Sequence, residues 1–331
     1  RNTCSAARET TLLSRGDLSD TWNDEENLGW RHFRGRTEQG GQPSCSPLWP
    51  PPRHRPVQQV TEPASLLVQE ASGALYDNKP FQGTYHGKRE KAKRKSNERR
   101  GTHRAETVGV GMGGGQTKPA HFTYDAVQLA VMVALLATEP FQRLIGFVNC
   151  MFKSHAGGLY DYYRCTLDAL FDEQPTLPRL FAPQLSIFPS VTLNLGPQTA
   201  TLPHLDLLNL AWGWCFITAL GWFDPTRSAL LVLWDLGMAI EFPPGSTIAI
   251  PSALLRHSNT SLAPGETRYS LTQFAAGGLF RYVENGFQLQ EEFLAGLTAE
   301  ELEARAEVDA EQFRKDVYEK QLNLLYIQFP E

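Results

Sequence analysis

Trp214-Cys-Phe-Ile-Thr-Ala-Leu220 is a short run of aromatic and β-branched residues within the part of the chain that decides the fold. Such runs favour β-strands when Gly, Pro, Asn or Asp bounds them. Similar runs lie at close spacing on both sides, over residues 190–195, 229–234, 238–242, 247–250, 267–274 and 279–283. Many short strands in series predict an antiparallel sandwich or jelly-roll barrel. We therefore expect an α+β fold with a double-stranded β-helix (jelly-roll, cupin-like) core.

Helices are expected on both sides of this strand-rich region. Apolar residues recur at helical spacing over residues 124–136, again over 141–152 beyond Pro140, and again over 162–171. These segments predict a layer of supporting helices. Near the other end, Thr298-Ala-Glu-Glu301 is a capping box that predicts the start of a charged helix running to about Leu325.

Composition divides the chain into three parts. Residues 1–116 are rich in Arg, Ser, Gly, Pro and Gln and offer few long apolar patterns, which predicts a basic, largely disordered extension. Residues 117–290 form the expected catalytic domain, and residues 291–331 the expected acidic C-terminal helix. Gly109-Val-Gly-Met-Gly-Gly-Gly115 lacks the G-K-[ST] ending of a phosphate-binding P-loop, so we expect a flexible hinge there.

Charge is segregated along the chain, although the net charge is only −5. A dense basic run lies within residues 87–104, whereas Asp and Glu dominate after residue 290. The basic run has two interpretations: a solvated tail, or a nuclear import signal and an arm that contacts DNA phosphates. The five cysteines are scattered, as expected for reduced thiols, and we expect a nuclear protein. The longest apolar run, residues 126–137, is too short for a bilayer, so no membrane association is expected.

His204-Leu-Asp206 and the later His257 are the candidate metal ligands. Two imidazoles and one carboxylate can hold one face of an Fe(II) ion and leave its other positions open, which is typical of non-haem iron oxygenases. The spacing H-x-D alone is a weak signal, and the alternative is that these are ordinary half-buried or surface residues. The strand-like segments around His257 favour the metal site, because the mouth of a jelly roll gathers side chains from strands distant in sequence.

Arg268 and Ser270 add a second chemical element to this pattern. An arginine is a permanently charged fork suited to a carboxylate. A serine two residues further along a strand shares its face and adds a hydroxyl donor. These two residues are the candidate site for the distal carboxylate of 2-oxoglutarate. The five residues together predict oxidation with Fe(II), 2-oxoglutarate and O2.

The segments around these residues resemble a known family. They are Thr201-Leu-Pro-His-Leu-Asp-Leu-Leu-Asn209 and its continuation to Gly221, together with 231–236, 242–248, 250–253, 257–259, 265–270 and 273–277. In these segments the chain is similar to the ten-eleven translocation and J-binding protein (TET/JBP) dioxygenases, in the transposon-associated branch expanded in mushroom-forming fungi. The resemblance covers about residues 107 to 287, and Gly113-Gly-Gly-Gln116 shares it.

The resemblance implies a substrate as well as a reaction. His204, Asp206 and His257 match the family's iron ligands, and Arg268 and Ser270 match its 2-oxoglutarate site. Asn209 stands at the position that lies against a base flipped out of DNA, and Phe274 at the position whose aromatic ring stacks on it. An amide can donate to and accept from a base edge, and an aromatic face suits an extruded base. On sequence alone, a turn Asn and a core Phe are equally good interpretations.

The expected function is therefore oxidation of the methyl group of a methylated DNA base. The first expectation is conversion of 5-methylcytosine to 5-hydroxymethylcytosine and further products, which would lead to DNA demethylation. Ala275 and Ala276 stand where some cytosine-oxidising relatives place a histidine, so N6-methyladenine demethylation by the same hydroxylation stays open. Two other classes also stay open: a hydroxylase of proteins or small molecules, and an inactive transposon-associated DNA-binding protein.

Overall fold

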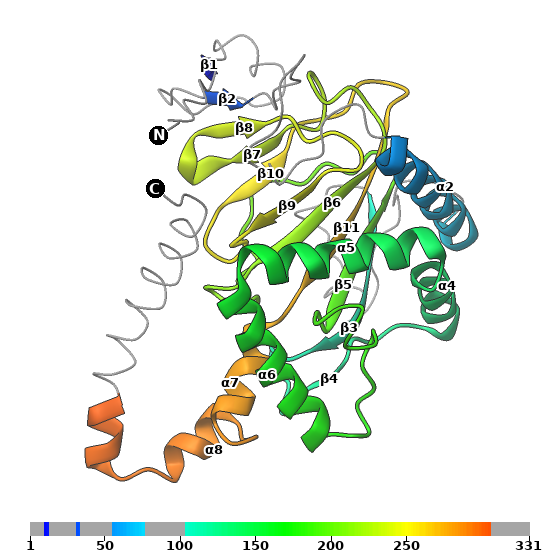
Figure 1. Cartoon of the computed structure of the whole chain (residues 1–331). Helices are drawn as coiled ribbons and strands as arrows, with labels where there is room; N and C mark the ends of the chain where they lie inside the picture. Colours follow the sequence, from blue (N-terminus) through cyan, green and yellow to red (C-terminus); the bar gives the residue numbers. More distant parts are fainter. Residues whose placement is uncertain (1–9, 13–30, 34–54, 77–102, 306–331) are drawn as a thin grey trace, which may run out of the picture.

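The computed structural model describes residues 10–12, 31–33, 55–76 and 103–305, and their fold is built on two β-sheets (Figure 1). The larger sheet has the strand order β4-β3-β5-β11-β6-β9 and the smaller one β1-β2-β8-β7-β10. The bounds of the larger sheet are β3 Arg104–Gly111, β4 Ala120–His121, β5 Ser190–Gly196, β6 Cys215–Trp222, β9 Thr247–Ile250 and β11 Thr267–Phe274. Those of the smaller sheet are β1 Thr10–Leu12, β2 Arg31–Phe33, β7 Leu231–Leu233, β8 Met238–Ile240 and β10 His257–Asn259.

Antiparallel pairing connects the strands from β5 to β11 into the expected double-stranded β-helix. β11 lies between β5 and β6 in the larger sheet, while β7 lies between β8 and β10 in the smaller one. The segment around His204 joins the smaller sheet through an antiparallel bridge to His257. A small apolar cluster, including Ala219 of β6 and Leu233 of β7, packs the two sheets together. The expected jelly-roll core is confirmed.

Helices cover the outer face of the larger sheet, as the apolar spacing predicted. They are α4 Ala126–Leu136, α5 Glu139–His155 and α6 Gly157–Glu173. Val191, Leu193 and Leu271 point from the sheet into the same buried cluster as α4 and α5. The start of α4 is stabilised by a capping box in which the Asp125 side chain accepts from the Gln128 backbone N–H at 2.8 Å.

Four segments of the expected disordered extension belong to the fold instead: β1, β2, α2 and β3. Helix α2, Arg55–Tyr76, buries Val60, Ala64, Val68 and Ala71 against the larger sheet and its helices. Residues at this spacing lie on one face of a helix. Two of the four are small alanines and the residues between them are mostly polar, so the apolar pattern of the helix is weak in the sequence. Ser65 Oγ also accepts a hydrogen bond from the Gly221 backbone N–H at 2.8 Å, which ties α2 to β6.

β3 likewise moves the beginning of the domain upstream of residue 117. It pairs with β5 from Arg104 to Gly109, so Arg104 belongs to the sheet and not to the basic run. The expected hinge is wrong at Gly109, because a Cβ there would lie 2.1 Å from the Pro189 carbonyl oxygen. Glycine is needed at this position for close strand packing. The rest of the basic run, residues 87–102, lies outside the described residues.

The prediction of a strand over residues 279–283 is also wrong, because these residues lie in α7, Gly277–Glu284. Leu279 and Phe280 are buried and Val283 packs beside them, which is helical spacing that a short apolar run does not distinguish from a strand. After α8, Gln290–Ala295, the predicted capping box is present: Glu301 N–H donates to Thr298 Oγ1 at 3.2 Å and Thr298 N–H to Glu301 Oε2 at 2.8 Å. The remainder of the expected C-terminal helix, from residue 306, lies outside the described residues.

No single helix within the described ranges is long and apolar enough to cross a bilayer. Joined together, α4 and α5 reach the required length and hydropathy, but they are bent by 73° at their junction. Much of α5 is buried against the sheet.

Candidate metal centre

Backbone pairing brings the three candidate metal ligands together. The His204 N–H donates to the His257 carbonyl at 3.1 Å, and the His257 N–H donates back to the His204 carbonyl at 3.0 Å. Asp206, two residues beyond His204, is held by its backbone N–H, which donates to the Ser252 carbonyl at 2.9 Å. Because residues i and i+2 of an extended segment share a face, His204 and Asp206 point to the same side.

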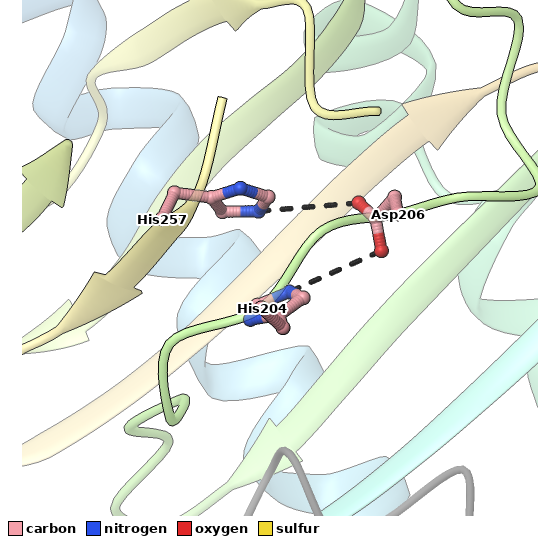
Figure 2. Close-up of side chains that lie close together, drawn as sticks. All are labelled: His204, Asp206 and His257. Atoms are coloured by element: carbon pink, nitrogen blue, oxygen red, sulfur yellow. Dashed lines mark ion pairs between the residues drawn. The ribbon is translucent and has the colours of Figure 1, made fainter. Parts of the chain in front are cut away.

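The three side chains converge on one point, as Figure 2 shows. One ligand atom from each of His204, Asp206 and His257 lies within 4.8 Å of the others. His204 Nε2 is 3.9 Å from Asp206 Oδ1, and His257 Nε2 is 3.9 Å from Asp206 Oδ2. Two ligands about 2 Å from one ion of the first transition row can be at most about 4 Å apart, so the three side chains would move slightly closer together around a bound ion.

Second contacts fix the orientation of both imidazoles. His204 Nδ1 lies 2.7 Å from the Leu202 carbonyl, and His257 Nδ1 lies 2.8 Å from the Leu255 carbonyl. A carbonyl oxygen can only accept, so each Nδ1 carries the proton and each Nε2 presents a lone pair. Such outer contacts are typical of metal-bound histidines. Two imidazole lone pairs and a carboxylate facing one point fit a cation, and this donor set fits Fe(II).

Arg268 lies in the same cavity as a buried cation. Its guanidinium donates to the Thr199 carbonyl at 3.1 Å, while Nε has no hydrogen-bond partner among the described residues. Within the same ranges no carboxylate forms an ion pair with it. Burial lowers the pKa of Arg268 to about 10, so the group remains protonated at neutral pH. A buried positive charge with a spare donor fits a carboxylate ligand.

Ser270 lies two residues beyond Arg268, on the same face of β11. Its Oγ accepts a hydrogen bond from Asn194 Nδ2 at 2.8 Å, across the β5–β11 pair. The hydroxyl proton of Ser270 is thereby left to donate to another acceptor. The distal carboxylate of 2-oxoglutarate fits beside Arg268 and Ser270.

A cavity of about 740 Å³ joins these groups. All seven candidate site residues line it: His204, Asp206, Asn209, His257, Arg268, Ser270 and Phe274. The structure thus brings together every predicted site residue, while their individual roles stay predictions. The Asn209 amide donates from Nδ2 to Ser252 Oγ at 3.0 Å.

Several cavity residues were not predicted from the sequence. Asn194 could have been found, because strict alternation in Val191-Thr-Leu-Asn-Leu195 leaves Thr192 and Asn194 on the face opposite the apolar residues. Ser252, which lies outside the cavity lining and accepts from Asn209 Nδ2, carries no recognisable signal. Tyr76, Glu106 and Gln128 also line the cavity and form a hydrogen-bonded cluster, but they come from elements placed in the extension or in the supporting layer.

Comparisons with known proteins give only distant likenesses. No protein-family model and no curated protein matches this chain. One similar solved structure is described as NgTET1 in complex with 5mC DNA, with 18% identity, a TM-score of 0.35, and coverage of 53% of this chain and 61% of that one. Another is an oxidoreductase of the 2OG-Fe(II) oxygenase family from Burkholderia pseudomallei, with 15% identity, a TM-score of 0.29, and coverage of 73% and 93%. The match therefore spans less than two thirds of the first structure's length, and at such TM-scores neither likeness carries an argument about function.

Replacing the metal carboxylate should remove metal binding. Asp206→Ala leaves two imidazoles, and we expect metal affinity to fall by more than about 100-fold, since loss of an outer contact alone costs 10- to 100-fold. Calorimetric titration with Fe(II) under anaerobic conditions measures this. Saturating metal, at 100 times the wild-type Kd, should stabilise the wild type by about 2.7 kcal/mol and the variant by less than about 0.4 kcal/mol. His155→Ala, a histidine outside the cavity, is the control; equal metal binding by Asp206→Ala would contradict the site.

Replacing Arg268 should weaken binding of 2-oxoglutarate. A hydrogen bond between charged groups contributes about 1.5 to 3 kcal/mol, so Arg268→Ala should raise the Kd about 10- to 100-fold. Titration of the metal-loaded protein with 2-oxoglutarate measures the change. Arg143→Ala, an exposed arginine on α5, should leave the Kd unchanged. An unaltered Kd for Arg268→Ala would place the cosubstrate elsewhere.

Proposed function

We propose that this protein is a 2-oxoglutarate- and Fe(II)-dependent dioxygenase that oxidises the methyl group of a methylated DNA base. The observation that carries the proposal is one cavity with two complementary ends. At one end, His204, Asp206 and His257 converge with their Nε2 atoms oriented by backbone carbonyls. At the other, the buried Arg268 has no carboxylate partner among the described residues. A dicarboxylic keto acid that also chelates a metal is complementary to both ends.

The chain's own residues hold and orient the reactants. The two histidines and Asp206 would hold Fe(II) by one face, and Arg268 with Ser270 would hold the distal carboxylate of 2-oxoglutarate. When bound, iron and 2-oxoglutarate supply the oxidising power: one oxygen atom of O2 enters the substrate methyl group and the other enters succinate as CO2 leaves. The His257 side chain is 4% exposed and Asp206 17% exposed, so both ligands are largely shielded from solvent.

Phe274 and Asn209 support a nucleobase as the substrate. Phe274 lies on the same strand face as Arg268 and Ser270, since these positions are even steps apart in β11. Asn209 lies three residues beyond Asp206 and offers an amide to the same cavity. Ala275 and Ala276 are buried and bring no further hydrogen-bonding side chain. An aromatic ring with one amide fits 5-methylcytosine, and the same groups fit N6-methyladenine as the alternative base.

Nucleoside analysis tests the reaction and the substrate together. We expect duplex DNA containing 5-methylcytosine, incubated with enzyme, Fe(II), 2-oxoglutarate and O2, to yield 5-hydroxymethylcytosine and succinate detectable by mass spectrometry. A parallel duplex containing N6-methyladenine tests the alternative base by its conversion to adenine. Asp206→Ala should abolish both products, because oxygen activation needs the metal.

The outcomes separate the remaining classes of function. Oxidised bases that persist with Asp206→Ala would contradict the metal site. Succinate formation without any oxidised base would favour a hydroxylase of proteins or small molecules. DNA binding without succinate would favour an inactive DNA-binding protein.

We also propose that the basic run contacts DNA phosphates and directs the protein to the nucleus. Tyr76 and Arg104, the described residues on either side of residues 77–102, both line the cavity. Arg104 is part of β3, and its guanidinium lies 4.4 Å from the centre of the Tyr76 ring. A test of the arm should therefore leave residues 103 and 104 in place.

Neutralising the arm should weaken DNA binding and its dependence on salt. Changing Lys88, Arg89, Lys91 and Lys93 to Gln should lower the slope of log K against log salt by up to about 0.9 for each phosphate that the variant no longer neutralises. Fluorescence anisotropy with a duplex across a salt series measures this. A matched control neutralises Arg143, Lys153, Arg164 and Arg227, which are exposed on other surfaces. Identical slopes for the two variants would mean that the arm is a solvated tail.

A further inference from the structure

Two leucines that line the cavity are largely exposed to solvent. Leu207 is 76% exposed and Leu208 is 64% exposed, and both line the cavity directly after the metal ligand Asp206. In the sequence they lie between this ligand and Asn209, so they adjoin both a candidate metal ligand and a candidate base contact. Large apolar side chains at such a position, exposed to this extent, indicate contact with an apolar partner.

The turn that carries the leucines is held by several backbone hydrogen bonds. The Asn209 N–H donates to the Asp206 carbonyl at 2.9 Å, and the Gly277 N–H donates to the Leu208 carbonyl at 2.9 Å. The backbone N–H of Leu210, the residue after Asn209, donates to the Ala275 carbonyl at 3.1 Å. The leucines therefore project from a fixed support that includes the start of α7.

A glycine-containing turn lies against Leu208. A Cβ on Gly113 would lie 3.3 Å from Leu208 Cδ2, and Gln116 closes this turn through its side chain, which accepts from the Gly113 N–H at 3.0 Å. Gly113, Gly114 and Gln116 also line the cavity. This gives Gly113-Gly-Gly-Gln116 a structural role, as a wall that supports Leu208.

The burial of the metal ligands determines how a base in duplex DNA could reach them. The side chains of His204, Asp206 and His257 are 13%, 17% and 4% exposed. A base that remains stacked in a duplex cannot approach atoms this deep, so it must be extruded. Extrusion breaks stacking and leaves a gap whose flanking bases expose apolar faces. Apolar side chains, leucine among them, are known to insert between base steps. In such a gap they would cover the exposed apolar faces of the flanking bases.

We propose that Leu207 and Leu208 insert into the base stack of duplex DNA and fill the place vacated by the extruded base. The inference rests on the proposed function and adds to it a residue pair that makes the duplex usable as a substrate. The leucines would act on extrusion and not on the chemical step. A single-stranded substrate has no stack to re-form and should not need them.

Comparing duplex and single-stranded substrates tests this separation. The double variant Leu207→Ser with Leu208→Ser should lower kcat/KM on a methylated duplex at least tenfold and change it less than twofold on the same strand alone. A duplex with an abasic site opposite the methylated base should recover most of the missing activity. The 2-aminopurine fluorescence of a probe beside the target base should rise on binding of the wild type and stay low with the variant.

A matched control replaces Leu66 and Leu236 with Ser, because these leucines are 48% and 52% exposed but lie outside the cavity lining. Equal losses on duplex and single strand would overturn the proposal and indicate direct contact with the base or local misfolding. No loss on the duplex would overturn it as well. If the wild type oxidises neither DNA form, the proposed function itself fails. If the wild type oxidises duplex DNA and the leucine variant does so equally well, only the inference about the leucines fails.

Discussion

The reciprocal backbone hydrogen bonds between His204 and His257 are the constraint on which the site depends. They are 3.1 and 3.0 Å long. They join the segment before Asp206 to β10, which comes much later in the sequence. The pair sets the imidazole rings with their centres 4.3 Å apart. Because side chains alternate along extended segments, a slip of one residue would turn one histidine to the opposite face and destroy the convergence.

Alternation along β11 provides the rest of the site in the same way. Arg268, Ser270 and Phe274 face the cavity, while Tyr269 and Leu271 face the helices and pack in the apolar cluster around α4 and α5. One strand therefore carries the proposed cosubstrate anchor, the ring proposed to face the base, and part of the core. β11 lies between β5 and β6, so pairing on both sides fixes the register of these groups. A shift of this strand would disturb binding and stability together.

The chemistry of the site could be predicted from the sequence more fully than its surroundings. His204, Asp206, His257, Arg268 and Ser270 form a chemical pattern, and a jelly roll brings such positions together. α2 could not be predicted in this way, because Ala64 and Ala71 bury little apolar area and many of its other residues are polar. The 279–283 run was ambiguous, since five residues fit either period. Asn194 and Ser252 act through partners distant in sequence, and only the three-dimensional register shows those partners.

The buried Arg268 explains a further property of the architecture. Removing a charge from water costs several kcal/mol unless partners compensate, and the described residues offer Arg268 one carbonyl contact and no carboxylate. The lowered pKa of Arg268, about 10, expresses the same cost. A residue selected for stability alone would be paired or apolar. The uncompensated charge is a sign of a site shaped for an anionic ligand: the binding of a carboxylate would relieve the desolvation and contribute to affinity. By mass action the same ligand would stabilise the folded domain, so cosubstrate binding and domain stability are linked through this one side chain.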